Sequence, residues 1–361
     1  MKRYLPTLLI AMILVTSATI PESDRKPVDP DGFATKARQM DSVVARINRL
    51  EGQWIRDAWK KNHIDKSTEW KTVICPHDDY AYAGWLYPAV LSHIKAPVVI
   101  VLGVAHKAKK FGLEGKMLFD GFEKWKGPYG PVAVSSLRAD IQRNLPAGSW
   151  LVHDSIHAAE HSVEALVPFL QYYNRKVEII PILVPYMSFA SEDSLSLLLA
   201  GALGKVMKEK GLVWGRDVAI AISNDAVHYG DKEWGGENYA KFGCDSTGYR
   251  MALTHELEIV RTCLTGQPDR EKMRKFSKYT VRDNDYHLYK WSWCGRYSVP
   301  FGILTSVHLA AGLSLAPLSG TILGYGTSIQ QKPLPVDDLG MGVTAIAELH
   351  HWVGYAAVGY K

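Results

Sequence analysis

The chain has 361 residues, of which 47% are hydrophobic and 22% are charged, and its formal net charge at pH 7 is +5. It contains no low-complexity tract and no repeat, so its composition is that of a globular enzyme and excludes fibrous and disordered classes. No zinc-finger spacing, RNP-like motif or basic stripe is present, and nucleic acid is therefore not an expected partner.

The amino terminus has the layout of a secretory signal peptide. Lys2 and Arg3 precede an apolar run over residues 8–15, and small residues follow. We predict a signal over residues 1–20, cleaved after about Ala18. An uncleaved amino-terminal anchor is the alternative, although the run is short for a membrane span. The protein is thus expected to be exported, either periplasmic or secreted, and to touch a membrane only through its export signal.

A linker rich in Pro and Asp is predicted over residues 21–33, and residues 34–361 are predicted to form a single domain. Apolar spacing and turn residues predict helices at 34–62, 87–94, 136–144, 156–173, 191–210, 251–264, 270–278 and 300–313. Apolar β-branched runs predict strands at 71–75, 98–102, 177–184, 218–222 and 321–325, with a strand or helix at 342–349. A small hairpin over the site is expected within 117–131. Strands that alternate with helices indicate an α/β fold, a three-layer sandwich with a largely parallel central sheet.

Three of the predicted strands run into a histidine. The first stops at Pro76 and is followed at once by His77, the second leads to His106, and the third leads to His228. Open α/β sheets build their sites at the carboxyl ends of their strands. We therefore expect the three histidines to share one site, although a single histidine after a strand is usually a satisfied polar residue.

A metal is the first chemistry that such histidines suggest, and Cys294 is the candidate third ligand. It lies in a predicted loop, residues 291–296. A thiolate with two imidazoles suits iron, copper or zinc better than calcium or magnesium. Three protein ligands would leave coordination positions open for substrate. The alternative interpretation of Cys294 is a buried thiol beside two tryptophans.

His228 follows Asp225 by three residues, so a carboxylate could orient its imidazole and make it a general base. Ser223 lies nearby, but no nucleophile-elbow pattern surrounds it, and serine hydrolysis is disfavoured. Among the other cysteines, Cys244 and Cys263 could pair as a disulfide, which the sequence does not decide.

With these residues in view, the chain resembles the Memo-like family, also called AmmeMemoRadiSam system protein B, over roughly residues 71–345. That family is related in fold to the LigB-type, class III extradiol dioxygenases. The motifs that carry the resemblance are, in chain order, residues 76–84 (PHDDYAYAG), 102–106 (LGVAH), 160–164 (EHSVE), 223–230 (SNDAVHYG) and 294–296 (CGR).

The resemblance implies that His77 and His106 bind a metal, with Cys294 at the place where the dioxygenases carry a carboxylate ligand. It implies that His228 lies where the dioxygenases keep an acid/base histidine. Glu160 and His161 would line or brace the same cleft. Iron is the metal implied, and copper has also been discussed for the family.

The sequence departs from the family pattern beside the first histidine. Asp78 and Asp79 stand where the family usually has Ala-Gly, and with Tyr80 they are expected to shape the cleft. Lys107 stands where a second histidine is common, and a Gly-Ser-Trp-Tyr-like segment near the amino terminus is not visible. An export signal is also unusual for the family. Substrate and metal are therefore expected to differ from those of cytosolic relatives.

The function expected from the sequence is that of a metal-binding oxidoreductase with a dioxygenase-like site. It would use non-haem iron, or alternatively copper, to act on a small-molecule substrate of the phenolic type. A zinc-dependent hydrolase is one alternative, and a non-catalytic exported protein that binds a metal or ligand is the other. The sequence does not indicate an oligomeric state.

Overall fold

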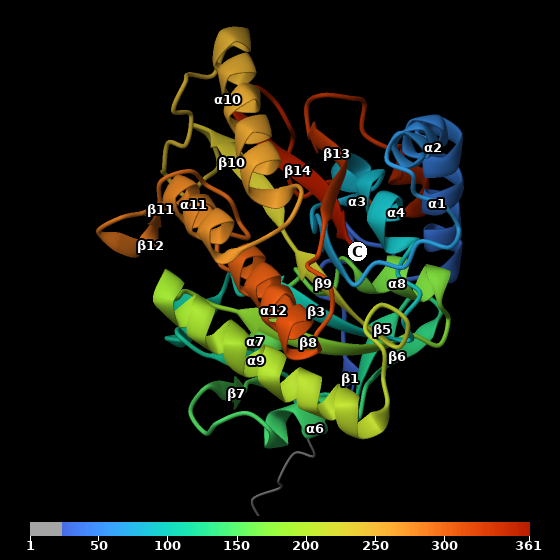
Figure 1. Ribbon diagram of the computed structural model, residues 1–361. Helices are drawn as coiled ribbons and strands as arrows, with labels where there is room; N and C mark the ends of the chain where they lie inside the picture. Colours follow the sequence, from blue (N-terminus) through green and yellow to red (C-terminus); the bar gives the residue numbers. More distant parts are fainter. Residues whose placement is uncertain (1–23) are drawn as a thin grey trace, which may run out of the picture.

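The computed structural model describes residues 24–361, which form one mixed α/β assembly around a large sheet (Figure 1). The expected signal peptide, residues 1–20, lies outside the described residues. The strands are β1 (Asp24–Arg25), β2 (Thr72–Cys75), β3 (Val98–Val104), β4 (Met117–Phe119), β5 (Lys124–Gly127), β6 (Gly130–Val134), β7 (Trp150–Val152), β8 (Glu178–Val184), β9 (Val218–Ser223), β10 (Asp225–Gly230), β11 (Val281–Arg282), β12 (Asp285–Tyr289), β13 (Gly320–Thr327) and β14 (His351–Tyr360).

The helices connect these strands. They are α1 (Ala37–Leu50), α2 (Gly52–Lys61), α3 (Tyr80–Ala83), α4 (Leu86–Leu91), α5 (Ala108–Phe111), α6 (Leu137–Arg143), α7 (Asp154–Ala159), α8 (Val167–Tyr173), α9 (Phe189–Lys210), α10 (Ser246–Ile259), α11 (Arg270–Thr280) and α12 (Ser298–Gly312). A π-helical turn, η1 (Val260–Leu264), continues α10, and a 3₁₀ turn, η2 (Asp337–Leu339), precedes the last strand. Across the described residues 24–361, no helix combines the length and the apolar character that crossing a membrane demands.

The sheet confirms the expected α/β class, with a parallel centre and antiparallel additions. Its strand order is β1-β5-β6-β8-β3-β9-β2-β14-β10. The strands β6, β8, β3, β9 and β2 pair in parallel, whereas β14 pairs antiparallel with β2, β10 and β13. The predicted hairpin exists as β5 and β6, but it extends the sheet between β1 and β8 and does not cover the site.

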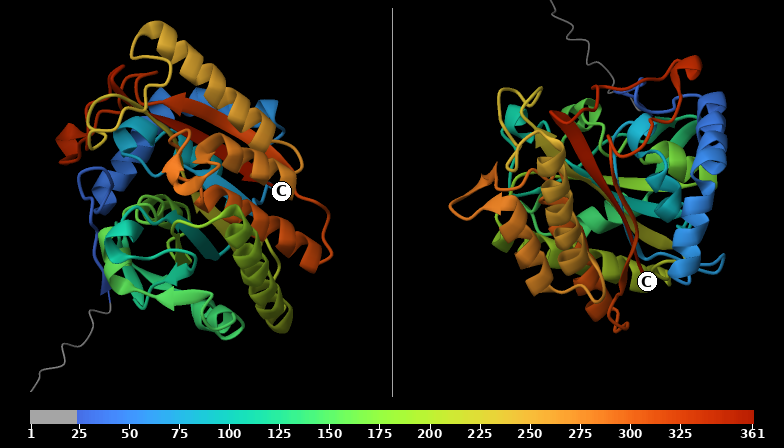
Figure 2. Two further views of the ribbon diagram at one scale, coloured as in Figure 1. Left: turned by 90° about the vertical axis from the view of Figure 1, so that its left-hand side faces the viewer. Right: turned by 90° about the horizontal axis from the view of Figure 1, so that it is seen from above.

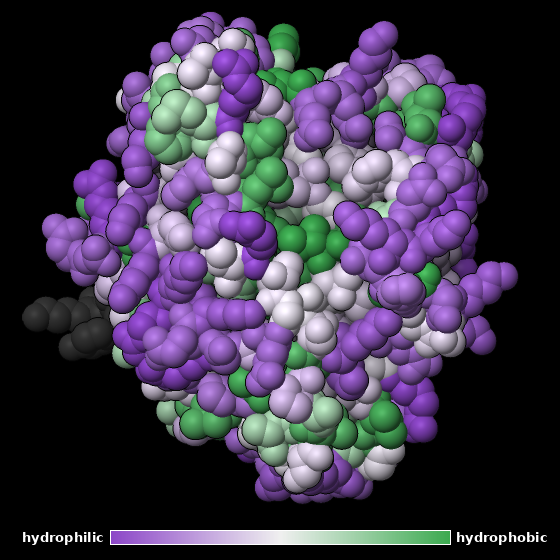
Figure 3. Space-filling model, turned by 45° about the horizontal axis from the view of Figure 1, so that its top comes forward, coloured by the Kyte–Doolittle hydropathy of each residue, from purple (hydrophilic) through white to green (hydrophobic). Residues whose placement is uncertain are grey.

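Helices cover both faces of the sheet, which produces three layers. The helices α1, α2, α4 and α8 pack on one face, and α9 and α12 pack on the other (Figures 1 and 2). Because β3 and β9 are covered on both sides, their side chains alternate between two apolar clusters: Val99 belongs to the first and Ile100 to the second. Hydrophilic side chains cover most of the face drawn in Figure 3, with a smaller apolar region near its centre.

The pairing between strands changes at the point of the sheet where the site lies. The strand β2 ends at Cys75, and the chain of β9 continues past Ser223 into β10, which pairs with β14 beyond the end of β2. Asn224 N donates to Cys75 O at 2.9 Å across this junction. Pro76 and His77 therefore leave the sheet where β10 takes over, and a gap at the carboxyl ends of β2, β3 and β9 results.

Residues 24–33, expected as an extended linker, are instead packed on the domain. The strand β1 pairs with β5, Arg25 is 2% exposed and Phe33 is 1% exposed. The Arg25 guanidinium forms a buried ion pair with Glu164, whose carboxylate also accepts hydrogen bonds from the backbone N–H groups of Val28 and Asp29. A buried carboxylate needs such partners, and they fix the segment in place.

Three predicted elements differ in detail. The helix expected over 34–62 is divided at Glu51, where ψ opens to −4° before Gly52. The helix expected over 156–173 breaks at Glu160, which is extended with φ −104° and ψ 142°. Residues 342–349 form neither a strand nor a helix, and the last strand begins at His351.

Candidate metal centre

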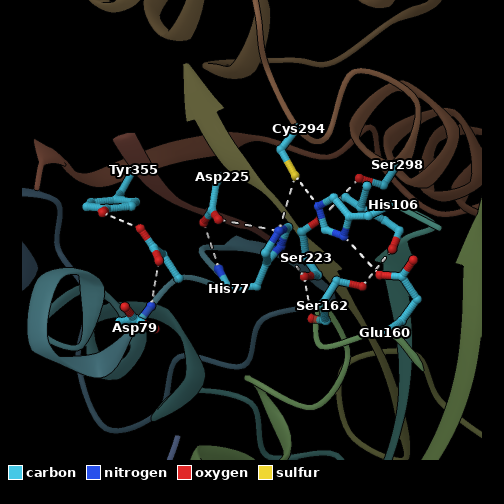
Figure 4. Close-up of polar contacts among 12 residues, drawn as sticks. His77, Asp79, His106, Glu160, Ser162, Ser223, Asp225, Cys294, Ser298 and Tyr355 are labelled. Atoms are coloured by element: carbon cyan, nitrogen blue, oxygen red, sulfur yellow. Dashed lines mark hydrogen bonds and ion pairs between the residues drawn. The ribbon is translucent and has the colours of Figure 1, made fainter. Parts of the chain in front are cut away.

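Two histidines and one cysteine converge at the gap in the sheet. The Nε2 atom of His77 lies 3.2 Å from the Sγ atom of Cys294, and the Nε2 atom of His106 lies 2.7 Å from the same sulfur (Figure 4). His77 is 1% exposed and Cys294 is 4% exposed. The three residues come from the ends of β2 and β3 and from the loop before α12. The strand-end expectation for His77 and His106 therefore corresponds to one shared group of ligand atoms.

The hydrogen bonds of Ser223 fix the tautomer of His77. The Ser223 hydroxyl donates its single hydrogen to Ser162 O at 2.6 Å, since a carbonyl oxygen only accepts. The Nδ1 atom of His77 lies 2.7 Å from Ser223 Oγ and must therefore be the donor of that contact. The proton of the neutral ring is on Nδ1, and Nε2 directs a lone pair toward Cys294.

Glu160 fixes the tautomer of His106 in the same way. Its carboxylate lies 2.9 Å from His106 Nδ1 and also accepts a hydrogen bond from the backbone N–H of Lys107. The carboxylate is an acceptor, so Nδ1 of His106 carries the hydrogen and Nε2 carries the lone pair. Glu160, expected from the resemblance to line or brace the cleft, is 1% exposed and braces His106.

The two Nε2 atoms and the Sγ atom have too few hydrogens to satisfy one another. Two imidazole lone pairs face one sulfur, and a thiol has a single hydrogen to donate. Burial lowers the pKa of His77 well below its ordinary value and raises the pKa of the Cys294 thiol, so burial opposes charging either group by itself. A cation among the three atoms would satisfy both lone pairs and stabilise the thiolate, and the donor set fits a borderline or soft metal.

Asp225 serves His77 and not His228. Its Oδ1 accepts from the backbone N–H of His77 at 2.8 Å, and its Oδ2 lies 3.3 Å from His77 Nε2. The expected contact between Asp225 and His228 is absent among the described hydrogen bonds. The pairing of β10 with β14 shifts register between these two residues, which turns the side chains to different partners.

His228 lines the same cavity without a carboxylate partner. Its Nε2 atom is buried and has no hydrogen-bond partner among the described residues. Burial, with the neighbouring His106 and His351, lowers its pKa to about 3, so the ring is neutral at physiological pH. The ring lies 5.1 Å from that of Trp234. An unpartnered imidazole nitrogen in a residue of the cavity wall can accept a hydrogen bond from a bound molecule.

His161 stacks on His106, with ring centroids 5.0 Å apart and planes 9° from parallel. Its ring nitrogen, together with a ring nitrogen of His106 and a carboxylate oxygen of Glu160, forms a second possible ligand group that shares His106 with the first. Burial lowers the pKa of His161 well below its ordinary value. The resemblance placed His161 at the cleft, and the structure has it in the cavity wall.

The cavity in front of these residues has a volume of about 310 Å³. Its lining residues are His77, Asp78, Asp79, Tyr82, His106, Lys107, His161, Asp225, His228, Trp234, Ser328, Thr344, Ala345, Ala347, His351 and Val353. Asp78 and Asp79 thus lie in the cleft as expected. Tyr80 does not, because its ring packs on Tyr87 and Phe169 and its hydroxyl donates to Ala165 O at 2.6 Å.

The two aspartates hold the cavity wall. The hydroxyl of Tyr355 donates to Asp78 Oδ2 at 2.5 Å, and the backbone N–H of Thr344 donates to Asp79 Oδ2 at 2.6 Å. Burial and the adjacent Asp78 raise the pKa of Asp79 to about 7. Each carboxyl is therefore committed to a neighbour within the protein, and both fasten segments near the carboxyl terminus of the chain to the loop after His77.

Glu256, which sequence reasoning missed, supports the loop that carries Cys294. Its Oε1 accepts from the indole N–H groups of Trp291 and Trp293 at 2.5 and 2.6 Å. Its Oε2 accepts from Tyr325 Oη at 2.8 Å and from Val227 N at 3.2 Å. One buried carboxylate thus joins the segment just before Cys294 to the strand that bears His228.

Close backbone approach also fixes this loop. The segments of Val227 and Trp293 form an antiparallel bridge, and His228 N donates to Ser292 O at 3.0 Å. A Cβ atom on Gly295 would lie 2.1 Å from Asn224 Oδ1, so only glycine fits there. The two tryptophans just before Cys294, Trp291 and Trp293, were the one sequence signal of this support.

Comparison with known proteins gives a family match that covers the residues of this site. The model of the family described as Memo-like protein matches residues 46–308, a range that contains all three convergent ligands and His228. The chain belongs to the Memo-like family. This confirms the resemblance found in the sequence. A MEMO1 family protein of Pyrococcus furiosus is 28% identical over 279 residues, covering 72% of this chain and 86% of the relative.

Other relatives match a shorter part of the Memo-like chain. A MEMO1 family protein of Pyrobaculum aerophilum is 32% identical over 162 residues, covering 43% of this chain and 52% of the relative. One of Aquifex aeolicus is 32% identical over 162 residues, covering 44% and 54%. The chain thus spans about half the length of these two relatives. An uncharacterized protein of Escherichia coli K12 aligns with a TM-score of 0.42 and 13% identity, over 78% of this chain and 98% of that one.

Proposed function

We propose that this Memo-like protein is a metal-dependent oxidoreductase with an extradiol-dioxygenase-like site. In this proposal His77, His106 and Cys294 hold one iron ion, or alternatively copper. The observation that carries it is the pair of Nε2 lone pairs directed at one sulfur, with both Nδ1 hydrogens already engaged. A redox-active metal bound there would supply electron-transfer and oxygen chemistry.

The surrounding residues would bind and orient a small substrate. The cavity of about 310 Å³ suits a single aromatic ring with polar substituents, and we propose a phenolic substrate. Trp234 and Val353 offer apolar surface in its wall, and Lys107 offers a positive charge for an ionised hydroxyl. His228, neutral and unpartnered at Nε2, would accept a hydrogen bond from such a hydroxyl.

Export is part of the proposal. The signal expected over residues 1–20 would deliver the protein to the periplasm or the outside, where it would acquire its metal. All four cysteines are free in the structure, including Cys294, and the Cys244–Cys263 pairing left open by the sequence does not occur. The helix α10 of 14 residues separates these two thiols, which places them about 20 Å apart along its axis.

The test is elemental analysis of protein purified from its native compartment. We expect about one equivalent of iron or copper, lost in His77→Ala and in Cys294→Ala, since three ligands are the usual minimum for such a site. Cys263→Ala, which removes a buried thiol elsewhere, is the matched control. Metal that survives both ligand substitutions would overturn the proposed centre.

Activity separates the reaction classes. Anaerobic protein loaded with ferrous iron should bind a catechol and then consume oxygen when air is admitted, and His228→Ala should reduce turnover while leaving the metal content unchanged. Zinc in the native protein with chelator-sensitive hydrolysis would point to a hydrolase. Tight metal binding without any turnover would identify a non-catalytic metal-binding protein.

A further inference from the structure

A second set of metal-binding side chains lies outside the candidate metal centre. It consists of Asp231, Cys244 and His350, whose ligand atoms all lie within 4.8 Å of one another. Asp231 Oδ1 lies 2.7 Å from His350 Nδ1, and the Cys244 thiol lies within 4.8 Å of the ligand atoms of both residues. None of these residues contributes to the first centre.

The backbone fixes Asp231 beside His350. Both Asp231 N and Lys232 N donate to His350 O, at 3.1 and 3.2 Å. Gly230 adopts φ +133°, and a Cβ there would lie 1.9 Å from His350 O, so the two segments approach as closely as glycine permits. The pairing of Gly230 with His351 at the end of the β10–β14 ladder thus presets two of the three ligands.

A separate pair of hydrogen bonds positions the third ligand, Cys244. Cys244 precedes Asp245, the N-cap of α10. Just before it, the hydroxyl of Tyr229 accepts from Phe242 N at 2.8 Å and donates to Gly243 O at 3.1 Å. Because Tyr229 belongs to β10, the same strand that leads into Asp231 also holds the chain next to Cys244.

We propose that Asp231, Cys244 and His350 form a second metal site that binds Zn²⁺. A thiolate, an imidazole and a carboxylate are the three side-chain ligand types that zinc accepts, and water can complete a tetrahedron. The thiol and the imidazole disfavour calcium and magnesium, and the carboxylate disfavours copper(I). The partial exposure of all three residues leaves an entry path for the ion.

The site would act as a clip for the cavity wall. Asp231 and Cys244 lie at the two ends of a loop that contains Trp234. The Trp234 ring stacks on His351 at 4.0 Å between centroids, and both residues line the first cavity. His350 and His351 are neighbours, one at each site. A zinc ion held by both ends of the loop would therefore restrict Trp234 beside His228.

Cobalt(II) is the probe, because a cobalt–thiolate bond absorbs in the near ultraviolet. The full-length chain carries Cys294→Ser, so that the first centre has no thiolate. We expect a charge-transfer band that saturates at about one equivalent of cobalt and that Zn²⁺ abolishes by displacement. The band should vanish when Cys244→Ser is added and persist when Cys263→Ser is added instead. Absence of the band, or its survival in the Cys244 variant, would overturn the site.

Two further variants test the other ligands. In the Cys294→Ser background, Asp231→Asn and His350→Ala should each weaken Zn²⁺ affinity by about tenfold or more, whereas Glu233→Gln in the same loop should not. Zinc should also slow proteolytic cleavage within residues 232–243, and an unchanged cleavage rate would refute the clip. With Cys294 intact, Cys244→Ser should retain the metal of the first centre, which separates the two proposals.

Discussion

Ser223 holds His77 in one tautomer, because its only hydrogen is already donated to the carbonyl of Ser162. The serine belongs to the last position of β9, and the histidine follows the end of the adjacent β2. A residue weighed as a nucleophile from the sequence is therefore an orienting residue for the candidate ligand. The parallel pairing of Cys75 with Ser223 produces this relationship directly.

We expect Ser223→Ala to weaken metal binding by about 10- to 100-fold, because the ring loses the acceptor that keeps its hydrogen on Nδ1. Chelator competition on the purified protein measures the change. Ser196→Ala removes another buried hydroxyl, which donates to Asp193 O at 2.8 Å on α9, and should leave the affinity unchanged. Equal affinities of the two variants would show that Ser223 does not set the tautomer.

Glu256→Gln should destabilise the protein and loosen the Cys294 loop. The carboxylate accepts from four donors, and an amide can accept only at its oxygen, so at least one buried N–H or O–H group loses its partner. The expected cost is about 1–3 kcal/mol in the free energy of unfolding, measured by urea titration. Metal affinity should fall with it.

Glu258→Gln on the same helix is the matched control for that change. Its carboxylate pairs with Arg261 at an exposed position, so its loss should cost about 1 kcal/mol or less. If Glu256→Gln resembled Glu258→Gln in both stability and metal affinity, the supporting role of Glu256 would be refuted.

The sequence predicted those parts of the site that depend on residues close together in the chain. A strand that stops at Pro76 places His77 at its end, and β3 places His106 likewise, so parallel pairing with β9 brings the ends together. The α/β class and the Memo-like family followed from the same short motifs. These features depend on residues near one another in the chain, which is why sequence patterns can predict them.

The rest depends on contacts between distant segments. Asp225 was assigned to His228 by spacing, but a register shift in β10 turns it to His77. Tyr80 was placed in the cleft by adjacency to His77, yet the short helix α3 directs it into the core. Glu256 acts from a helix whose sequence carries no mark of its partners. No spacing rule reports which remote donors a buried carboxylate will meet.

Arg25→Ala tests whether residues 24–33 are part of the domain. The substitution would leave Glu164 buried without its cation and remove the donors to His157 O and Glu160 O. We expect a loss of about 3–5 kcal/mol in the free energy of unfolding. Arg46→Ala, which breaks an exposed pair with Asp338, should cost about 1 kcal/mol or less. Equal losses would mean that the segment behaves as the linker expected from its composition.

His157→Gln should make the protein less sensitive to acid. His157 is fully buried, and its Nε2–H donates to Leu118 O at 2.9 Å, which requires the hydrogen on Nε2. Burial lowers its pKa from 6.5 to about 3, so the folded state keeps the ring neutral while the unfolded state takes up a proton. Stability from this group is complete above pH 6.5 and is lost as the pH falls toward 3, by about 1.4 kcal/mol per pH unit.

Glutamine retains a donor for Leu118 O but cannot be protonated, so the slope of unfolding free energy against pH should decrease by about one proton over that range. Urea titrations at several pH values, with chelator present throughout, measure the slope. His63→Asn changes an exposed histidine with a φ of 54°, a backbone conformation that asparagine tolerates, and should leave the slope unaltered. An identical slope for wild type and His157→Gln would show that His157 is protonated without loss of the fold, and that its burial does not contribute to acid unfolding.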